Sequence, residues 1–235
     1  MKERNVAIIT ARGGSKRIPK KNIKEFCGEP IIAYSIRAAL ESRLFDEVMV
    51  STDSEKIARI AEKYGASVPF MRSEETSNDF ATTADVILEV LAEYEKRGEE
   101  FDYACCIYPT APFLTAKKLC VAMEMMKEKS AAQLTSVVAY SFPPQRSFVI
   151  DTDGTMCYKF PEYRQKRSQD LEKMYHDAGQ FYIYRVSCYK NAKGKIAQGI
   201  IPFILPEMEV QDIDNEEDWK IAEMKYMILK QNEAI

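Results

Sequence analysis

The chain has 235 residues, of which 46% are hydrophobic, and a formal net charge of -3. This length is enough for one large α/β domain or two small ones. A charge this close to neutral argues against a general nucleic-acid binder, and no apolar run approaches the roughly 18 residues of a membrane-spanning helix. Residues 1–10 hold too few apolar side chains for a signal peptide, which favours a cytoplasmic protein.

The six cysteines contain no CxxC pair, and the chain has a single histidine, His176. Disulfides are mostly a feature of secreted proteins, so we expect all six thiols to be reduced and to serve mainly in packing. One histidine also argues against a zinc site built from cysteine and histidine.

The first half of the chain alternates apolar strands with helical patterns. Strands are predicted at 5–10, 46–52, 66–71 and 103–108, and helices at 30–42, 53–65, 81–98 and 115–129. Pro30 suits a first helical turn, Asp53 or Ser54 suits the N-cap of the second helix, and Gly65 suits its C-cap. This order predicts a mostly parallel sheet with helices on both faces.

The alternation stops after residue 140. Residues 141–175 are rich in proline, aromatic and charged side chains, with a hairpin predicted at Asp153-Gly154. Strands at 179–185 and 199–205 and an amphipathic helix at 215–230 follow. We therefore expect a single domain, 1–235, in which 141–175 is an inserted arm that acts as a mobile lid, an oligomerisation element or both.

A basic loop, "TARGGSKRIPKKN" at 10–22, follows the first predicted strand and carries five cations. Backbone N–H groups of a glycine-rich turn, backed by lysine and arginine, bind phosphate oxygens, although a solvated basic loop is the plainer alternative. Neither GxxxxGK[ST] nor GxGxxG is present. The remaining pattern, R-G-G-S-K-x-x-P-x-K-N after a strand, is typical of nucleotidyltransferases.

Three more segments, 51–53, 70–75 and 108–113, also follow predicted strands and should meet the basic loop at one edge of the sheet. An acidic segment at 207–218 holds seven carboxylates and no base. Together with the basic loop, it suggests a site for an anion and its metal ion. Asp212 and Asp214 alternate along it, so an extended backbone would point both to one side, which would suit a magnesium ion. The alternative is a helix N-terminus with Asp214 or Asn215 as its cap.

Five segments together resemble one enzyme family. "ARGGSKRIPKKN", "VSTD", "VPFMRSEE", "YPTAPF" and "QDIDNEEDW" look like the CMP-sugar synthetases, cytidylyltransferases that activate nonulosonic acids, and the likeness runs from Val6 to about Lys220. "RSQDLEKMYHDAGQFY" and "VQDIDNEEDW" most resemble the members that act on pseudaminic acid. The resemblance implies a Rossmann-like fold of the nucleotide-diphospho-sugar transferase type with a dimerisation arm, and hence a homodimer.

The implied reaction transfers CMP from CTP to the anomeric C2 hydroxyl of a nonulosonic acid and releases pyrophosphate. The same reaction on legionaminic or N-acetylneuraminic acid, and a non-catalytic nucleotide-binding module, remain as alternatives. A role in making glycosylated flagellin or a surface glycan is implied by the resemblance alone. We expect neither a nucleic acid nor a membrane to be a partner.

The resemblance also implies roles for individual residues. It assigns Arg12, Lys21 and Asp214 to catalysis and Asp212 and Asp214 to Mg²⁺. Its CTP-binding residues are Arg12, Gly13, Gly14, Ser15, Lys16, Lys21, Asn22 and Arg72. Its sugar-binding residues are Thr82, Thr83, Tyr108, Thr110, Arg167, His176 and Gln180, with Arg167 reaching a neighbouring subunit's ligand.

One motif departs from the sialic acid enzymes. These read "LQPTSPLR" where this chain has "IYPTAPFL", so Tyr108 replaces a glutamine and the following arginine is missing. An aromatic ring in place of an amide predicts a less polar patch for the sugar, which agrees with pseudaminic acid, a deoxy sugar with two amide groups. His176 can equally be a packed residue, and Thr82 and Thr83 can simply begin a helix.

Overall fold

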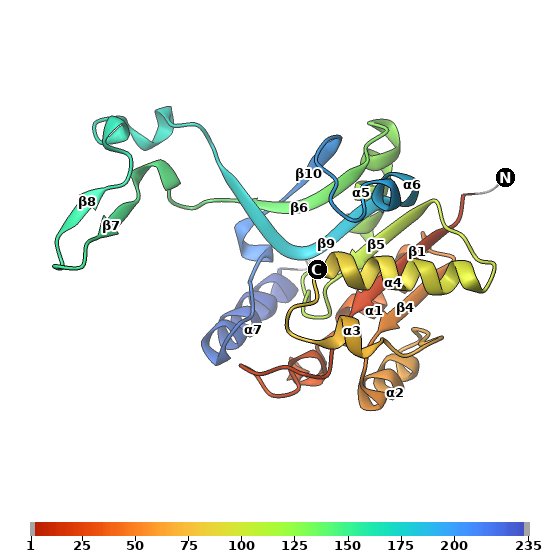
Figure 1. The fold of residues 1–235 in the computed structure, drawn as a ribbon. Coiled ribbons are helices and arrows are strands. Elements are labelled where there is room, and N and C mark those ends of the chain that lie inside the picture. The colour runs from red at the N-terminus through yellow and green to blue at the C-terminus, as the bar shows by residue number, and fades with distance from the viewer. Residues whose placement is uncertain (1–2, 233–235) are drawn as a thin grey trace.

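The computed structural model describes residues 3–232. Its central sheet has six strands in the order β10-β6-β9-β5-β1-β4 (Figure 1). The strands in chain order are β1 (Asn5–Thr10), β4 (Glu47–Ser51), β5 (Tyr103–Ile107), β6 (Gln133–Ala139), β9 (Tyr175–Arg185) and β10 (Ile200–Leu205). All are parallel to one another except β9, which runs antiparallel between β5 and β6.

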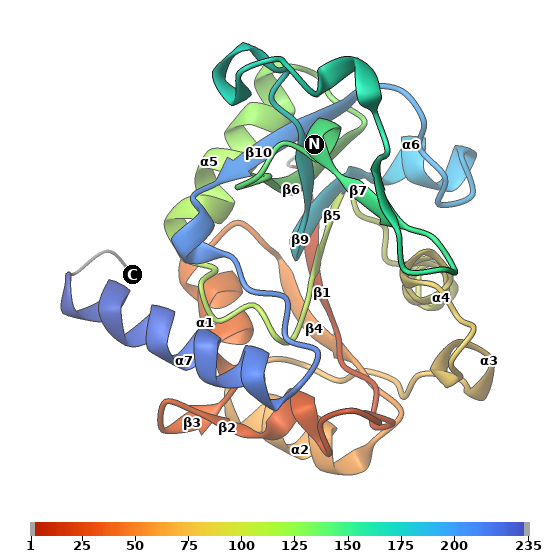
Figure 2. The ribbon, with the colours of Figure 1, turned by 90° about the vertical axis from the view of Figure 1, so that its left-hand side faces the viewer.

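Helices cover both faces of the sheet, as the alternation of strands and helices predicts (Figure 2). On one face, α1 (Ile32–Ser42), α2 (Glu55–Lys63) and α5 (Ala116–Glu128) pack against Ala7 and Ile9 of β1. On the other face, α4 (Thr83–Lys96) and α6 (Val186–Asn191) pack against Val6 and Ile8. Successive residues of a strand point to opposite faces, so β1 is apolar from Val6 to Ile9 because both of its faces are buried.

A third apolar cluster joins the last helix, α7 (Glu216–Gln231), to the segment after the basic loop. Trp219 of α7 packs edge-on against Phe26, and Ile213 and Ile18 are buried in the same cluster. This packing places the acidic segment beside the basic loop. The helix begins at an Asn215 cap whose side chain accepts the N–H groups of Glu217 and Asp218, which decides between the two predicted caps.

Several predicted element bounds differ from the structure, two of them for a physical reason that the sequence contains. The helix expected from 30 begins at Ile32, because Pro30 lies in β3 (Glu29–Pro30), which pairs with β2 (Glu25–Phe26). The strand expected at 66–71 is reduced to one parallel bridge between Ser67 and Met49. Pro69 has no N–H to donate, so the pairing beside β4 cannot continue. The cap of α2 is Ser54, and Asp53 has a different partner described below.

The strand β6 and the reversed direction of β9 are absent from the sequence-based prediction. β6 alternates buried and partly exposed residues, and it pairs with β9 through a register shift near Thr135. The chain leaves the sheet after β6, passes through the arm, and returns along β9. The return is antiparallel, so the start of β9 lies at the carboxyl ends of the parallel strands.

The arm leaves the body of the molecule between β6 and β9 and carries a two-stranded hairpin (Figure 1). The hairpin pairs β7 (Phe148–Ile150) with β8 (Met156–Tyr158) around Asp153-Gly154, as predicted. Ile150 is 73% exposed and Phe142 is 85% exposed. The arm therefore presents apolar side chains that the rest of this chain does not cover.

All six cysteines are free. Cys105 and Cys106 are buried in β5, which fits the predicted packing role, whereas Cys27 and Cys157 are exposed and do not. Within residues 3–232, none of the helices combines the length and the apolar character needed to cross a membrane.

Candidate active site

A cavity of about 480 Å³ lies at the carboxyl ends of β1 and β5. This is the edge at which open α/β sheets bind ligands, and the volume lies in the usual range for a small-molecule site. Twelve of the residues proposed from the sequence or adjacent to them line it: Arg12, Ser15, Lys16, Arg17, Lys21, Asn22, Arg72, Thr82, Thr83, Tyr108, Thr110 and Asp214. Five segments that are separate in the sequence therefore converge on one cavity: the basic loop, Arg72, Thr82–Thr83, Tyr108–Thr110 and Asp214.

The basic loop is held in place from both sides. Asn22 is buried and donates its side-chain amide to the carbonyl of Arg12, at 2.9 Å. The N–H of Gly13 donates to the carboxylate of Asp53, at 2.6 Å, and a Cβ on Gly13 would come within 3.1 Å of Ser54. Gly13 thus serves the close approach of two loops, and neither Gly13 nor Gly14 lines the cavity.

Arg12 and Lys16 both form ion pairs with Asp79 at the mouth of the cavity. The Arg12 guanidinium lies 3.0 Å from one carboxylate oxygen, and the Lys16 ammonium contacts the other. The hydrogen bond from Lys16 is the main cause of a lowered pKa for Asp79, and Arg12 adds to it. One exposed carboxylate therefore pairs with two of the cations that we expect to bind CTP.

Arg72 forms part of the buried floor of the cavity. Its Nε donates to the hydroxyl of Ser51 at 2.9 Å, and a terminal nitrogen donates to the Ser51 carbonyl at 2.6 Å. Burial lowers the pKa of Arg72, while the nearby charge of Asp53 opposes the shift. The end of β4 fixes this guanidinium, so it can meet a ligand without reorganising.

Lys21 lies between the basic loop and the acidic segment. Its ammonium donates to the carbonyl of Ile213 at 2.7 Å, while Arg17 forms a 2.7 Å ion pair with Asp214. Burial lowers the pKa of Lys21, and the charges of Asp214 and Asp212 oppose that shift. Burial, followed by the charge of Asp214, raises the pKa of Asp212. The two carboxylates are close enough to repel each other.

The described residues contain no cluster of three or more histidine, cysteine or acidic side chains that could hold a metal ion. Asp212 and Asp214, the two aspartates expected to bind metal, therefore have no third ligating side chain of these kinds among the described residues. Magnesium commonly binds one or two carboxylates and completes its shell with water and substrate phosphates. Burial first and the charge of Asp214 second raise the pKa of Asp212, and a bound cation would oppose both effects.

Four of the proposed sugar-binding residues line the same cavity: Thr82, Thr83, Tyr108 and Thr110. Thr82 is the N-cap of α4 in a capping box with Asp85, so its hydroxyl is already engaged. The hydroxyl of Thr83 lies 3.2 Å from that of Tyr108, whose carbonyl accepts a hydrogen bond from Ser35.

The other three proposed sugar-binding residues, Arg167, His176 and Gln180, do not line this cavity. His176 lines a separate cavity of about 280 Å³ with Asp177 and Asp212, and its ring packs 4.8 Å from that of Tyr140. Gln180 is buried under the site and donates to the carbonyl of Glu209. Arg167 lies in the arm, where it pairs with Asp170. Within one chain, none of these three lines the main cavity.

Sequence reasoning missed several residues that shape the site: Arg17, Ser51, Asp53, Asp79, Asp177 and Tyr182. Arg17 and Asp53 stand within the quoted motifs, so their position was a usable signal. Asp79 carries no such signal, because its pairing with the basic loop spans more than sixty positions.

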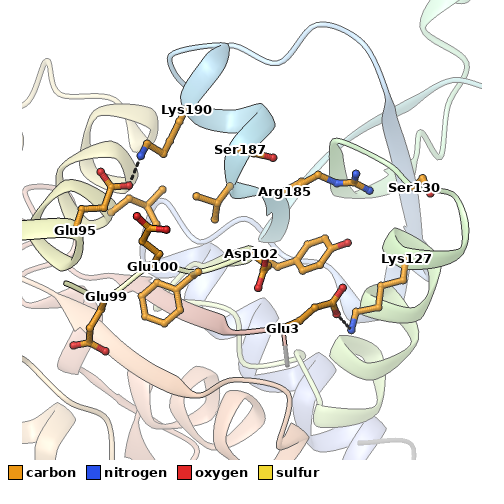
Figure 3. A pocket seen from close by; sticks show the side chains of 14 residues that line it. Glu3, Glu95, Glu99, Glu100, Asp102, Lys127, Ser130, Arg185, Ser187 and Lys190 are labelled. Carbon is orange, nitrogen blue, oxygen red and sulfur yellow. Dashed lines mark hydrogen bonds and ion pairs between the residues drawn. The ribbon is translucent and has the colours of Figure 1, made fainter. Parts of the chain in front are cut away.

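A larger cavity, of about 650 Å³, lies at the opposite edge of the sheet (Figure 3). Three of its five carboxylates form ion pairs: Glu3 with Lys127, Glu95 with Lys190, and Glu99 with Arg4. None of the motif segments reaches it. Its size therefore does not make it the active site.

The three-layer fold, and a cavity lined by a basic loop and an acidic side chain at the carboxyl ends of the strands, define a nucleotide-binding α/β protein of the nucleotidyltransferase type. The solved CMP:2-keto-3-deoxy-manno-octonic acid synthetase complexed with CTP has the same fold. It superposes with a TM-score of 0.70 at 18% identity, covering 97% of this chain and 100% of that one. Residues 6–217 match the family model described as cytidylyltransferase, and the chain belongs to that family.

Two characterised relatives cover almost the whole chain. The pseudaminic acid cytidylyltransferase of Campylobacter jejuni serotype O:2 is 39% identical over 96% of this chain and 97% of its own length. The CMP-N,N'-diacetyllegionaminic acid synthase of Legionella pneumophila is 33% identical over 99% of this chain and 100% of its own length. The family resemblance drawn from the motifs is therefore confirmed.

Proposed function

We propose that this protein transfers CMP from CTP to the C2 hydroxyl of a nonulosonic acid, with pseudaminic acid as the substrate. The observation that carries the proposal is the single cavity that combines Arg12, Lys16 and Lys21 with Asp214. Full-length similarity to a pseudaminic acid cytidylyltransferase supports the choice of sugar.

In this reaction the C2 hydroxyl oxygen attacks the α-phosphorus of CTP in line, and the bond to the pyrophosphate oxygen breaks. Arg12, Lys16 and Lys21 would neutralise the triphosphate, and the buried Arg72 would lie near the base. Ser15, Asn22 and the glycines shape the loop. Catalysis of this kind rests on positioning and on stabilising charge.

Asp212 and Asp214 would hold a divalent cation, for which we propose Mg²⁺. When bound, the cation supplies positive charge to the triphosphate. The chain's own contribution is to keep Lys21 against the Ile213 carbonyl, so that the acidic pair stays beside the basic loop.

The same chemistry on legionaminic acid is the second candidate, because of the Legionella relative. Tyr108 favours pseudaminic acid, since its ring offers an apolar surface where the sialic acid enzymes have an amide. N-acetylneuraminic acid is the third sugar to be compared.

We also propose that the chain is one domain and that residues 141–175 form the contact of a homodimer. The exposed apolar side chains of the arm support this assignment. Arg167, which lies far from its own cavity, would then reach the ligand of the neighbouring subunit. We assign the enzyme to the cytoplasm, where CTP is available, and the product to surface-glycan or flagellin glycosylation.

The test is pyrophosphate release from CTP and Mg²⁺ with pseudaminic, legionaminic or N-acetylneuraminic acid, or with no sugar. Release with pseudaminic acid alone is expected. Release with another sugar alone would keep the reaction and replace the substrate. CTP binding without release in any mixture would contradict the proposal and leave a nucleotide-binding module.

A further inference from the structure

A groove on the arm is lined mainly by aromatic and proline side chains. Its volume is about 510 Å³, and its lining includes Tyr140, Phe142, Pro144, Phe148 and Tyr158. The rings of Phe148 and Tyr158 lie 4.5 Å apart across the hairpin. Phe142 is 85% exposed, so this chain leaves the groove open to solvent. An exposed apolar groove of this kind indicates a place where another surface docks.

Cations surround the apolar groove. Arg146 lines it and donates a hydrogen bond to the hydroxyl of Ser168, at 3.1 Å. The Arg164 guanidinium lies 5.7 Å from the centre of the Tyr158 ring. Within the part of the chain that the structure describes, Arg167 alone among the six cations of the arm forms an ion pair. The groove therefore favours an aromatic side chain that has carboxylates beside it.

Phe80 is such a side chain. Among the large hydrophobic side chains of the described residues it has the highest exposed fraction, 94%. Residues 73–80 carry three acids and no base, so the ring stands at the end of a negatively charged segment. Met208 also has acidic neighbours, but it is 42% exposed, and one of those neighbours, Glu209, already pairs with Lys118. Phe80 and the groove therefore complement each other in polarity and in charge.

The backbone that carries Phe80 is held in place. The N–H groups of Phe80 and Ala81 donate to the side-chain oxygen of Asn78, at 2.8 and 3.0 Å, and the Asn78 carbonyl accepts a hydrogen bond from Arg12. Asn78, Asp79 and Ala81 line the nucleotide cavity, whereas Phe80 does not. The ring is thus presented outward beside that cavity on a fixed backbone, which lowers the entropy cost of docking.

The occupant of the groove must come from another molecule. In Figure 1 the hairpin of the arm lies far from α3 (Glu74–Ser77), which leads to Phe80. We propose that the arm groove of one subunit takes up Phe80 of the partner subunit, with the acids of 73–80 facing the cations around the groove. Two-fold symmetry then forms the same contact twice. This inference rests on the proposed homodimer and names the surface of the neighbouring subunit that the arm contacts.

The first experiment measures the dissociation constant of the dimer by sedimentation over a range of dilutions. Phe80→Ser removes the ring, and Phe80→Trp keeps an aromatic ring. Met224→Ser is the matched control, because Met224 is 60% exposed on α7, outside both surfaces. Circular dichroism establishes that each variant folds.

Phe80→Ser should raise the dissociation constant about a hundredfold, about tenfold for each of the two symmetric contacts. Phe80→Trp and Met224→Ser should both stay near the wild-type value.

The second experiment identifies the surfaces that touch. The background replaces the exposed Cys27 and Cys157 by serine. Phe80→Cys and Phe142→Cys are made in separate chains, mixed at high concentration and treated with a short bis-maleimide. In the mixed dimer one of the two symmetric contacts keeps both native rings, so the dimer still forms. We expect a cross-linked dimer in the mixture and none in either variant alone.

The outcomes separate this inference from the proposals on which it rests. A wild-type dimer whose dissociation constant is unchanged by Phe80→Ser, or a mixture that does not cross-link, would overturn the inference and leave the homodimer in place. A monomeric wild type would contradict the homodimer and the inference with it. Neither measurement uses CTP or a sugar acid, so both results are independent of the proposed reaction.

Discussion

The ammonium of Lys21 donates a hydrogen bond to the carbonyl oxygen of Ile213, at 2.7 Å, and so joins residues 192 positions apart in the sequence. Ile213 stands between the two aspartates of the acidic segment, so this bond adds to the apolar packing of Ile213 in holding the basic loop beside the proposed metal ligands. The contact is partly buried, which strengthens it relative to a surface contact. Lys21 thus lies beside the two aspartates, but its hydrogen bond goes to a backbone carbonyl and not to either carboxylate.

Replacing Lys21 tests this link. Lys21→Met keeps the length of the side chain but removes its charge and its hydrogen bond, so kcat should fall by about tenfold to a hundredfold, as loss of one charge-stabilising donor does. Steady-state kinetics with CTP and sugar measure the loss. Lys20→Asn is the matched control, because Lys20 is the neighbouring exposed lysine and has a left-handed backbone (φ 55°) that asparagine tolerates. An equal loss of kcat in both variants would show that Lys21 contributes only its positive charge and not a specific contact.

Much of this arrangement could be predicted from the sequence, for a physical reason. Strands buried on both faces, such as β1, are continuously apolar and are bounded by polar loops, so their existence and order are local properties. The same holds for the basic loop and the acidic segment, whose residues are contiguous. Asn22, Arg72 and Asp214 therefore meet where the order of strands requires.

The rest depends on contacts between distant segments. The direction of β9 is set after a long excursion through the arm, and the pairing of Asp79 with Arg12 spans 67 positions. No local pattern encodes either one. Gly179 is the only sequence feature that marks the bulge in β9. A single glycine does not predict which carboxylate the bulge will reorient.

Asp79 should compete with CTP for the basic loop. It pairs with Arg12 and Lys16, two cations that line the cavity, so Asp79→Asn should free them and lower KM for CTP about two- to fivefold. The effect should shrink as salt is raised, because the pair is exposed. Glu75→Gln, the same change of acid to amide on the exposed α3 (Glu74–Ser77), is the control. A higher KM in Asp79→Asn would show instead that Asp79 helps to bind the nucleotide.

Asp212 should destabilise the folded state of the metal-free protein, although we expect it to be needed for activity. Its pKa in the folded state is raised by burial first and by Asp214 second, so the folded state disfavours the ionised form. Asp212→Asn should therefore raise the melting temperature at neutral pH in the absence of metal. The gain should vanish as the pH falls below the ordinary range of an aspartate, where wild type is protonated in both states.

The same variant should lose at least about a hundredfold in kcat at saturating CTP, as expected when a charge-stabilising site is removed. Asp214→Asn should lose activity to a similar extent, and both should need more Mg²⁺ for half-maximal rate. Glu217→Gln, in the same acidic segment but in the first turn of α7, should change neither property. A fully active Asp212→Asn enzyme would remove this residue from the metal site.

The arm provides the last test, because its proposed role is separate from the chemistry of the cavity. Ile150 and Met156 pair across the hairpin and are 73% and 60% exposed, an apolar surface that a lone chain leaves in water. Exchanging both for glutamate should convert the proposed dimer to a monomer, measured by light scattering after gel filtration. Thr152→Glu and Thr155→Glu, in the turn of the same hairpin, add the same charge beside this pair and should leave the dimer intact.

If Arg167 reaches the neighbouring ligand, the monomer should also show a higher KM for the sugar at an unchanged KM for CTP. A monomeric variant with wild-type kinetics would separate assembly from catalysis and confine the site to one chain.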